Sequence, residues 1–326
     1  MSYYVDQPVD NRQLGYVEDR GAEMPLVAAR DVYKSYGSVP VLADVNFDIL
    51  PGITGLLGSN GAGKTTLLGM ILGLHPIDSG TLLVHGHNPA NAGPEIRALS
   101  GYAPEHHTLP PHLKAMEFVG HVAELHGLPP SDAATRASDA LWLVGLGEER
   151  FRPMGTMSTG QRQRVKLAQA IAHDPRIVLL DEPTDGLDPI QRDLMLELIT
   201  HISTEFGISI VVSSHLLHEV EQVCDAVVII GEGRTLATGR IDELRLNRPS
   251  GVELEIDATP SEVEAIAAQL TQIGFYTTSA GRKLLVDGDD RALDAIRDTL
   301  ADFGVGLVRL SREKPSLEDV FLEWLG

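Results

Sequence analysis

Apolar and polar residues alternate along the first strongly patterned segment of the chain, residues 26–49. Near the end of this segment every second residue is apolar, at Val41, Ala43, Val45, Phe47 and Ile49. A period of two places such side chains on one face of a β-strand, and Gly37 and Pro40 are typical turn residues. The pattern therefore predicts antiparallel strands with one face in the core and the other toward water.

Four short apolar runs further along the chain have the length of buried strands. They occupy residues 53–57, 177–180, 208–212 and 226–230. Segments with helical character separate them, and strands that alternate with helices form parallel sheets whose faces the helices cover. These runs predict an α/β core built on a mainly parallel sheet.

A helical pattern interrupts this α/β region. Apolar residues recur about one helical turn apart at Leu113, Met116, Val119 and Val122. The sequence Pro129-Pro130-Ser131 is typical of the start of the next helix. We predict a helical insert over approximately residues 106–165.

After Asn247 the pattern restarts with a strand in which Val252, Leu254 and Ile256 alternate with polar residues. The helix that follows is expected to place four apolar residues on one face: Val263, Ile266, Leu270 and Ile273. Gly274 stands where this helix is expected to end, because glycine readily adopts the left-handed conformation of a helix C-terminus.

The remaining tail continues with a strand pair around Gly281, a helix and a closing strand at 305–310. The second helix carries its apolar residues at Leu293, Ile296 and Leu300. The order βαββαβ predicts a small ferredoxin-like α+β domain. We therefore predict a flexible acidic arm at 1–24, a large α/β domain with an antiparallel β subdomain at 25–247, and a second domain at 248–326.

Length and composition are consistent with two globular domains. The chain has 326 residues, of which 43% are hydrophobic and 22% charged, as in ordinary folded proteins. No run approaches the roughly 20 consecutive apolar residues of a membrane-spanning helix, and the polar N-terminus lacks the features of a secretory signal. We expect a cytoplasmic chain. Its net charge of -20 argues against a broad nucleic-acid-binding surface, which needs clustered Lys and Arg.

The strongest motif lies between the apolar run 53–57 and a helical pattern that continues from Thr66. It reads Gly58-Ser59-Asn60-Gly61-Ala62-Gly63-Lys64-Thr65. Glycines allow successive backbone N–H groups to curl around phosphate oxygens, and the helix N-terminus adds favourable partial charge. We predict that this segment and Thr66 bind ATP, that Lys64 reaches its β- and γ-phosphates and that Thr65 binds Mg²⁺. A purely structural glycine turn is the alternative.

Two carboxylates stand at the end of the apolar run 177–180, where α/β sheets bind their ligands. Asp181 is predicted to hold Mg²⁺ through water, and Glu182 to polarise the attacking water as general base. The alternative is a solvated acidic turn. His215 follows the run 208–212 and is predicted to contact the γ-phosphate, with a structural histidine as the alternative.

A further segment, Ser158-Thr159-Gly160-Gln161-Arg162-Gln163-Arg164, resembles the signature motif of ABC ATPases. Ser158 is suited to cap the following helix and Gln161 to complete a capping box, which aims a helix N-terminus at an anion. The resemblance implies that this anion is ATP held by a second copy of the chain, in a head-to-tail dimer with two nucleotides between the subunits. It also implies that the segment 185–188 lines the subunit contact. The nucleotide contacts expected on this surface are Ser158, Thr159, Gly160, Gln161 and Asp188.

Thr159 departs from the family pattern, since the family more often has glycine there. Two more matches extend the resemblance over residues 26–240. Tyr36 corresponds to the aromatic residue that stacks on adenine, with a core tyrosine as the alternative. Glu105 stands where the family usually has glutamine, and it is expected to face Mg²⁺. The resemblance further implies that the region 107–117 faces a membrane subunit and transmits closure to it.

Near the end of the chain, the segment Pro315-Ser316-Leu317-Glu318-Asp319-Val320-Phe321-Leu322 resembles the C-terminal segment of ATP-binding subunits from multidrug and related exporters. The resemblance implies a P-loop ABC ATPase that drives a separate multi-span permease from the cytoplasmic face of the membrane. The domain at 248–326 would then serve regulation or dimerisation.

Two other classes of protein are alternatives to an exporter subunit. A soluble ABC ATPase acting on ribosomes or in assembly usually carries two cassettes in tandem, whereas this chain has one phosphate loop and one signature segment. A phosphate-loop kinase or GTPase does not account for the segment 158–161. The sequence therefore favours the transporter subunit.

Overall fold

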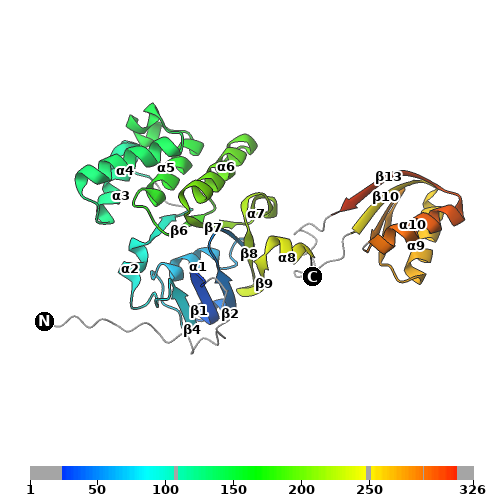
Figure 1. Cartoon of the computed structure of the whole chain (residues 1–326). Helices are drawn as coiled ribbons and strands as arrows, with labels where there is room; N and C mark the ends of the chain where they lie inside the picture. The colour runs from blue at the N-terminus through cyan, green and yellow to red at the C-terminus, as the bar shows by residue number, and fades with distance from the viewer. Residues whose placement is uncertain (1–23, 106–108, 247–250, 289, 314–326) are drawn as a thin grey trace. The chain divides into compact units, whose positions relative to one another are not determined.

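The computed structural model describes residues 24–105, 109–246, 251–288 and 290–313. The predicted acidic arm, except its last residue, and the exporter-like segment 315–322 lie outside the described residues. The chain divides into two compact units, Met1–Gly239 and Arg240–Gly326 (Figure 1). The division between them falls a few residues before the domain boundary predicted at 247.

An antiparallel sheet in the order β2-β1-β4 begins the first unit. Its strands are β1 (Val27–Tyr36), β2 (Val39–Ile49) and β4 (Ser79–Val84). The predicted antiparallel strands are thus present, but the alternation predicted along β2 is wrong in its first half. There Leu42 is buried, whereas Val41 and Ala43 are only partly buried, because a bulge before Val45 changes the side-chain period.

A second sheet has six strands in the order β5-β6-β7-β3-β8-β9. The strands are β3 (Ile53–Leu57), β5 (Ser100–Ala103), β6 (Ile177–Asp181), β7 (Ser209–Ser214), β8 (Ala226–Gly231) and β9 (Arg234–Arg240). The pairs β5·β6, β6·β7, β3·β7 and β3·β8 are all parallel. This confirms the mainly parallel core. Parallel strands bring the carboxyl ends of β3, β6 and β7 to one edge.

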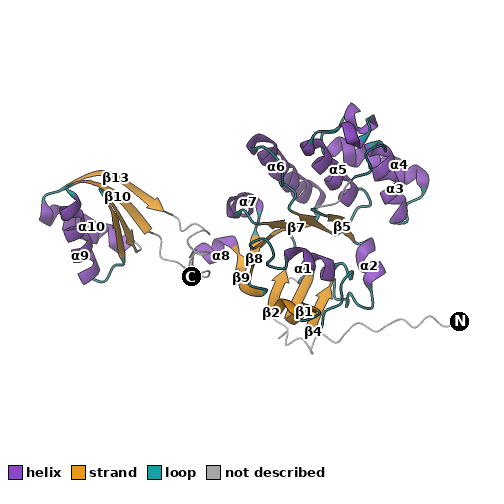
Figure 2. Cartoon of the chain, turned by 180° about the vertical axis from the view of Figure 1, so that it is seen from behind, coloured by secondary structure: helices purple, strands orange, loops and turns teal. Residues whose placement is uncertain are grey.

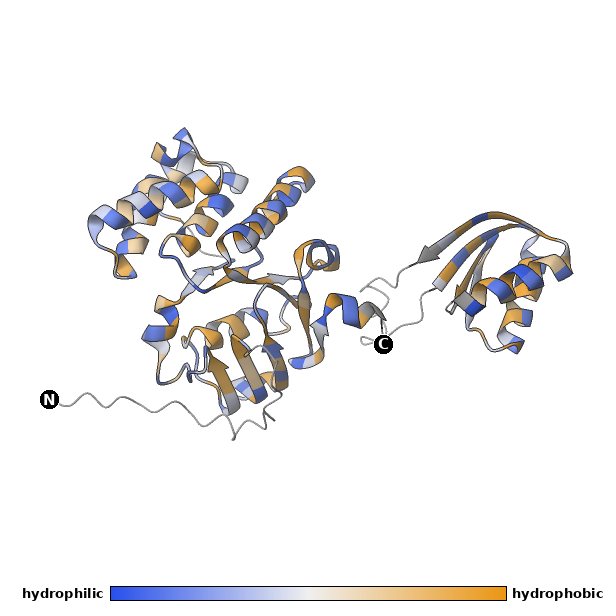
Figure 3. Ribbon diagram, in the orientation of Figure 1, coloured by the Kyte–Doolittle hydropathy of each residue, from blue (hydrophilic) through white to orange (hydrophobic). Residues whose placement is uncertain are grey.

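Helices cover both faces of this sheet (Figure 2). The helices described in this unit are α1 (Lys64–Ile71), α2 (Gly93–Ala98), α3 (Ala115–Leu125), α4 (Pro130–Leu143), α5 (Thr159–Ile171), α6 (Pro189–Phe206) and α7 (Leu217–Val223). Of these, α1 lies on one side of the sheet and α5 and α6 on the other (Figure 2), whereas α3 and α4 pack on α5. In β6, Ile177 and Leu179 belong to a core shared with α1 and the antiparallel sheet. Val178 and Leu180 belong to a second core, shared with α3, α4, α5 and α6. Successive residues of β6 are therefore buried in different cores, as expected for a parallel strand covered on both faces. Figure 3 colours the ribbon by the hydropathy of each residue.

The helical insert differs from the sequence prediction at its start. Leu113 was expected on the apolar face of a helix, but it is exposed and precedes α3, which begins at Ala115. The face that α3 buries consists mainly of small residues, Ala115, Val119 and Ala123, which a search for large apolar side chains misses. The next helix, α4, begins at Pro130 as predicted, and two short 3₁₀ turns, Glu148–Phe151 and Met154–Thr156, lead to α5.

The second unit starts with α8 (Ile241–Leu246) and contains a four-stranded antiparallel sheet in the order β11-β12-β10-β13. In chain order its elements are β10 (Gly251–Asp257), α9 (Pro260–Gln272), β11 (Thr277–Ala280), β12 (Lys283–Asp287), α10 (Asp290–Phe303) and β13 (Gly306–Glu313). Residues of both helices and of β10 and β12 form one core. The βαββαβ order matches the prediction.

One residue of α9 was assigned wrongly. Val263, Ile266 and Leu270 are buried, but Ile273 is 55% exposed. The helix ends before Ile273, which is its C-cap, and Gly274 follows with a φ of +102°. The last residue of the apolar series therefore lies past the helix and turns away from the core. Among the described residues of both units, no helix combines the length and the hydropathy needed to cross a bilayer.

Candidate active site

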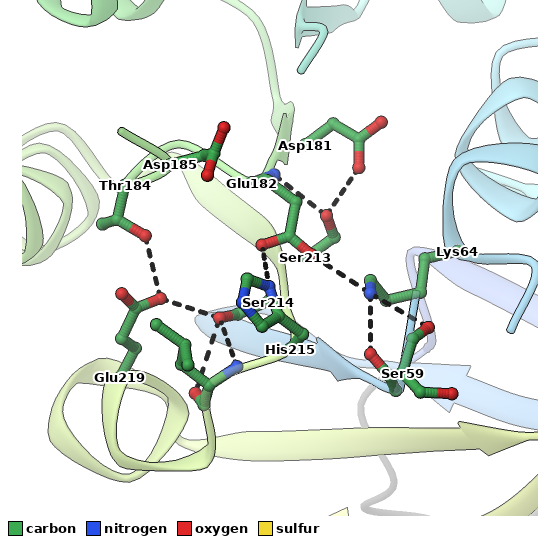
Figure 4. A network of polar contacts seen from close by, with 12 residues as sticks. Ser59, Lys64, Asp181, Glu182, Thr184, Asp185, Ser213, Ser214, His215 and Glu219 are labelled. Atoms are coloured by element: carbon green, nitrogen blue, oxygen red, sulfur yellow. Dashed lines mark hydrogen bonds and ion pairs between the residues drawn. The ribbon is translucent and has the colours of Figure 1, made fainter. Parts of the chain in front are cut away.

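Three loops that follow neighbouring parallel strands form the candidate site. The glycine loop 58–63 follows β3, the carboxylates Asp181 and Glu182 stand at the end of β6, and His215 follows β7. Because β6, β7 and β3 are adjacent in the sheet, these groups meet at one edge (Figure 4). The structure thus brings together residues that lie more than a hundred positions apart in the sequence.

The glycine loop has positions that only glycine satisfies. A Cβ atom on Gly58 would lie 2.4 Å from the carbonyl oxygen of Ile230, and Gly63, the N-cap of α1, has a φ of +102°. Gly61 also has a positive φ, with open space where a Cβ would lie. Thr65 is exposed beside this open loop, at the N-terminal turn of α1. The backbone can therefore approach an anion closely at the start of this helix.

Lys64 reaches back along the loop and contacts a carboxylate. Its Nζ atom donates a hydrogen bond to the Gly58 carbonyl oxygen at 2.7 Å and lies 3.1 Å from Glu182 Oε1. The side chains of Lys64 and Glu182 are only 6% and 7% exposed. The predicted phosphate ligand and the predicted general base thus form a buried ion pair with each other.

Glu182 is held from both its backbone and its side chain. It has a φ of +47°, a region that residues other than glycine seldom adopt. Its backbone N–H donates to Ser213 Oγ at 3.0 Å, and its Oε2 atom lies 2.9 Å from His215 Nδ1. Lys64, Glu182 and His215 therefore form one chain of polar contacts, which the sequence did not reveal.

Asp181 has one engaged and one available carboxylate oxygen. Ser213 Oγ donates to Asp181 Oδ1 at 2.6 Å. No donor among the described residues reaches the buried Oδ2 atom. A buried carboxylate oxygen of this kind suits a hard cation or its bound water, so the residues present fit Mg²⁺. Burial raises the pKa of the neighbouring Tyr102 to about 12, and the negative charges of Asp181 and Glu105 contribute less.

Tyr36 and Glu105 lie outside this chain of contacts. Tyr36 is 47% exposed, which excludes the core tyrosine, and its ring meets the edge of His75 at a centroid distance of 6.0 Å. Glu105 follows β5, and its backbone carbonyl accepts a hydrogen bond from Lys166 Nζ at 2.7 Å. That lysine also donates to the carbonyl of Pro104, and burial lowers its pKa.

The signature segment forms a second group of candidate residues at the N-terminus of α5. Ser158 Oγ accepts from the Gln161 N–H at 3.2 Å and Gln161 Oε1 accepts from the Ser158 N–H at 3.0 Å, which confirms the capping box. Thr159 is exposed, whereas Gly160 is buried next to Gln191. Asp188 caps the adjacent α6 by accepting from the Gln191 N–H at 2.9 Å.

Within one chain this second group is separate from the glycine loop. The helices α5 and α6 lie on one side of the six-stranded sheet and α1 on the other, as Figures 1 and 2 both show. The structure therefore brings Lys64, Asp181, Glu182 and His215 together and keeps Ser158 apart from them. That separation agrees with a site shared between two chains.

Four residues that hold the site in place were not predicted from the sequence. They are Thr184, Ser213, Ser214 and Glu219, all buried. Ser213 and Ser214 end β7 immediately before His215, and polar residues at the end of an apolar run are a usable signal. Thr184 and Glu219 carry no such signal, because neither belongs to a recognisable pattern.

Comparison with known proteins places this site in a family. The family model for ABC transporters matches residues 42–185, which include the glycine loop, the signature segment and both carboxylates. A solved structure described as the ATP-binding subunit of an ABC transporter is similar, with 29% identity and a TM-score of 0.60 over 68% of this chain and 92% of that chain. A dimeric ATP-binding cassette, MJ0796, bound to ADP and Pi shares the fold, with 24% identity, a TM-score of 0.59, and 66% and 98% of the two chains covered.

Curated relatives match nearly the whole chain. The Nod factor export ATP-binding protein I of Cupriavidus metallidurans is 32% identical, over 92% of this chain and 97% of that protein. The bacitracin transport ATP-binding protein BcrA of Bacillus licheniformis is 31% identical over the same shares. The linearmycin resistance ATP-binding protein LnrL of Bacillus subtilis is 29% identical, over 92% and 98%. The chain therefore belongs to the ABC transporter ATP-binding proteins, the subunits that hydrolyse ATP for transport.

Proposed function

We propose that this chain is the motor of an ABC exporter, with Lys64 and Glu182 at the centre of its ATPase site. The observation that carries the proposal is the buried chain of contacts from Lys64 through Glu182 to His215, beside Asp181. In this proposal the glycine loop and Lys64 bind the β- and γ-phosphates. Glu182 takes the proton of the attacking water, and His215 contacts the γ-phosphate.

The proposed metal is Mg²⁺, held by Thr65 and Asp181 and faced by Glu105. Mg²⁺ neutralises charge on the phosphates and orients them. Asp181 is fixed for this role because Ser213 holds one carboxylate oxygen and leaves the other for the metal or its water. Tyr36 is exposed at the end of β1, so it can stack on adenine without rearranging the core.

Lys64 must exchange partners when ATP binds. In the structure its charge is balanced by Glu182. A γ-phosphate carries more negative charge than the Glu182 carboxylate, and its oxygens accept hydrogen bonds from a lysine as well as carboxylate oxygens do. Transfer of Lys64 to the phosphate frees the Glu182 carboxylate, which then accepts a proton from water. ATP binding and activation of the base are thus coupled through one lysine.

The second partner is another copy of the chain, in a head-to-tail dimer with ATP between the subunits. The capped N-terminus of α5 supplies backbone donors at an exposed position, next to Asp188 at the start of α6. These groups lie away from the glycine loop of their own chain, so a second subunit is needed to bring the two surfaces together. The dimeric cassette MJ0796 shares the fold and supports this arrangement.

A separate permease is the third component of the proposal. A cavity of about 340 Å³ opens at the start of α5, where apolar residues meet cationic side chains. Its lining includes Leu109, Pro111, Met154, Arg162 and Lys166. It borders the region that the family resemblance assigns to the membrane subunit, and we propose that a cytoplasmic segment of the permease enters it. The chain would then work on the cytoplasmic face of the membrane.

The export direction rests on the relatives. Those named for Nod factor export, bacitracin transport and linearmycin resistance match this chain over its tail as well as its core. Purification of the tagged chain from detergent-solubilised membranes of its own cells tests the proposal. A multi-span membrane protein should co-purify in stoichiometric amount. Ribosomal proteins in its place would favour the soluble ABC ATPase.

We also propose that the C-terminal unit is a ferredoxin-like domain that regulates or stabilises the dimer. Its βαββαβ order and the strand order β11-β12-β10-β13 support the fold. It has its own hydrophobic core. A chain ending at Asn247 should bind ATP normally but dimerise more weakly. Loss of ATP binding in a truncated chain that circular dichroism shows to be folded would contradict this division.

A further inference from the structure

A buried glutamate, Glu219, contacts the loops that carry Glu182 and His215, but it is not itself part of the chain of contacts from Lys64 to His215. Glu219 is the third residue of the short helix α7, and it is only 1% exposed. A buried carboxylate is costly unless hydrogen bonds and an opposite charge compensate it. The groups that compensate Glu219 come from three other segments of the first unit. Figure 4 shows two of them, Thr184 and Ser214.

One oxygen of Glu219 receives two of these groups. Thr184 Oγ1 donates to Glu219 Oε2 at 2.9 Å, and Ser214 Oγ donates to the same oxygen at 2.7 Å. Arg192, in the first turns of α6, places its Nε atom 3.2 Å from the other oxygen, Oε1. The carboxylate thus ties the loop after Glu182, the start of α6 and the end of β7 to one point.

The contact with Ser214 acts directly on His215. The Ser214 hydroxyl gives its single proton to Glu219, which leaves its oxygen free to accept from the Leu216 N–H at 3.0 Å. These two residues flank His215, so the hydroxyl closes a tight turn with the histidine at its centre. The turn presents His215 Nδ1 to Glu182 Oε2 at 2.9 Å.

We infer that Glu219 is a positioning residue for ATP hydrolysis, which locks the His215 turn to the loop of Glu182. The inference rests on the proposed roles of Glu182 and His215. The two catalytic loops then keep their register through a carboxylate that contacts Thr184, Ser214 and Arg192. Because Arg192 and Thr184 flank Asp188 in sequence, movement of the proposed subunit contact is transmitted to His215 through Glu219.

Two isosteric substitutions test this inference. Glu219→Leu removes every contact and should lower kcat roughly 10- to 100-fold, as expected for a misplaced catalytic group. Glu219→Gln keeps an oxygen for both hydroxyls and should lose less. Neither should change the Kd for Mg-ATP by more than about twofold, since the contacts of Glu219 with described residues run to Thr184, Ser214 and Arg192 and not to the glycine loop. Equal loss in both variants, or loss of ATP binding alone, would overturn the inference.

Two more conservative variants distinguish a positioning effect from a general loss of stability. Thr184→Val removes one hydrogen bond to Glu219, and Thr299→Val changes a threonine of the C-terminal unit that is equally buried, each being 3% exposed. Only Thr184→Val should lower kcat. Equal effects on kcat in the two variants would show a general loss of stability and would contradict the positioning role.

The closing experiment separates this inference from the proposed function. Glu219→Leu is combined with His215→Ala for the kinetics. The ¹³Cε1 resonance of His215, assigned by its loss in His215→Ala, is recorded in the wild type and in Glu219→Leu. If Glu219 acts by placing His215, the His215 resonance shifts in Glu219→Leu. The kcat of the double variant should then lie within about threefold of the kcat of His215→Ala. An unshifted resonance overturns the inference. A shifted resonance with full activity in His215→Ala upholds the placement and refutes the catalytic role of His215.

Discussion

Because Lys64 pairs with Glu182, the variant Glu182→Gln is expected to change ATP affinity as well as the rate of hydrolysis. Loss of a general base alone would change only the rate. At 3.1 Å and an effective dielectric constant of about 20, the pair has a gross Coulomb attraction of about 5 kcal/mol. Desolvation of two nearly buried charges offsets most of it. We therefore assign a net value of about 1–2 kcal/mol to the contact that Lys64 must break when it moves to the γ-phosphate.

Glutamine has the same shape as glutamate and tolerates the same backbone, but it leaves the Lys64 charge without a carboxylate. ATP should then bind about tenfold more tightly, because about 1.4 kcal/mol corresponds to one decade in affinity. The nucleotide-free variant should be less stable than the wild type. Hydrolysis should fall about 10²- to 10⁴-fold, since the base is lost. The ATP-bound variant should accumulate as a closed dimer.

Isothermal titration with ATP measures the affinity, and urea unfolding with and without ATP measures the stability. Glu219→Gln is the matched control, because it neutralises the other buried glutamate, which does not contact Lys64. Its ATP affinity should equal that of the wild type. An unchanged or weaker affinity in Glu182→Gln would refute the exchange of partners by Lys64, and undiminished turnover would remove Glu182 from catalysis.

Three further predictions follow from single side chains. Lys64→Ala should weaken ATP binding itself, because the phosphates lose their cation; normal affinity in equilibrium dialysis would count against the phosphate cradle. Tyr36→Ala should weaken ATP binding by about 1–3 kcal/mol, the value of one stacked base, whereas Tyr36→Phe should bind normally, and equal affinities in a fluorescence titration would exclude stacking. His173 stacks on His126 at a centroid distance of 3.7 Å, and burial lowers its pKa to about 4. The unfolded state therefore binds more protons than the folded state between pH 6.5 and 4. As the pH is lowered through this window, the free energy of unfolding of the wild type should fall by roughly 2–3 kcal/mol more than that of His173→Gln. The same pH dependence of the free energy of unfolding in both proteins, measured by urea unfolding, would contradict this.

Much of the fold was predictable because its signals are local. The alternation at Val252, Leu254 and Ile256, the glycine loop before Lys64 and the capping box of Ser158 each depend on residues close in sequence. Where the prediction was wrong, a feature of the tertiary structure determined which side chain is buried. The bulge in β2 buries Leu42 against the local period, and the end of α9 releases Ile273 from the core.

The candidate site was predictable as a set of motifs but not as an arrangement. The sequence assigned Lys64 to phosphate and Glu182 to water as separate roles, and the structure shows that the two side chains contact each other. That contact depends on β3 and β6 both adjoining β7 in the sheet, an order that no short motif encodes. Glu219 was missed for the same reason, since two of its partners, Thr184 and Arg192, come from segments far away in the sequence.

We propose that Lys64, Asp181, Glu182 and His215 form an ATPase site that two chains complete. The most direct test measures phosphate release from Mg-ATP, per chain, as the concentration of the purified protein rises. The wild type should release phosphate with a specific activity that increases with concentration until the dimer saturates, and Glu182→Gln should remain near background throughout. A wild-type rate no higher than that of Glu182→Gln at every concentration would contradict the site, and a specific activity independent of concentration in a chain shown to be monomeric would contradict the dimer.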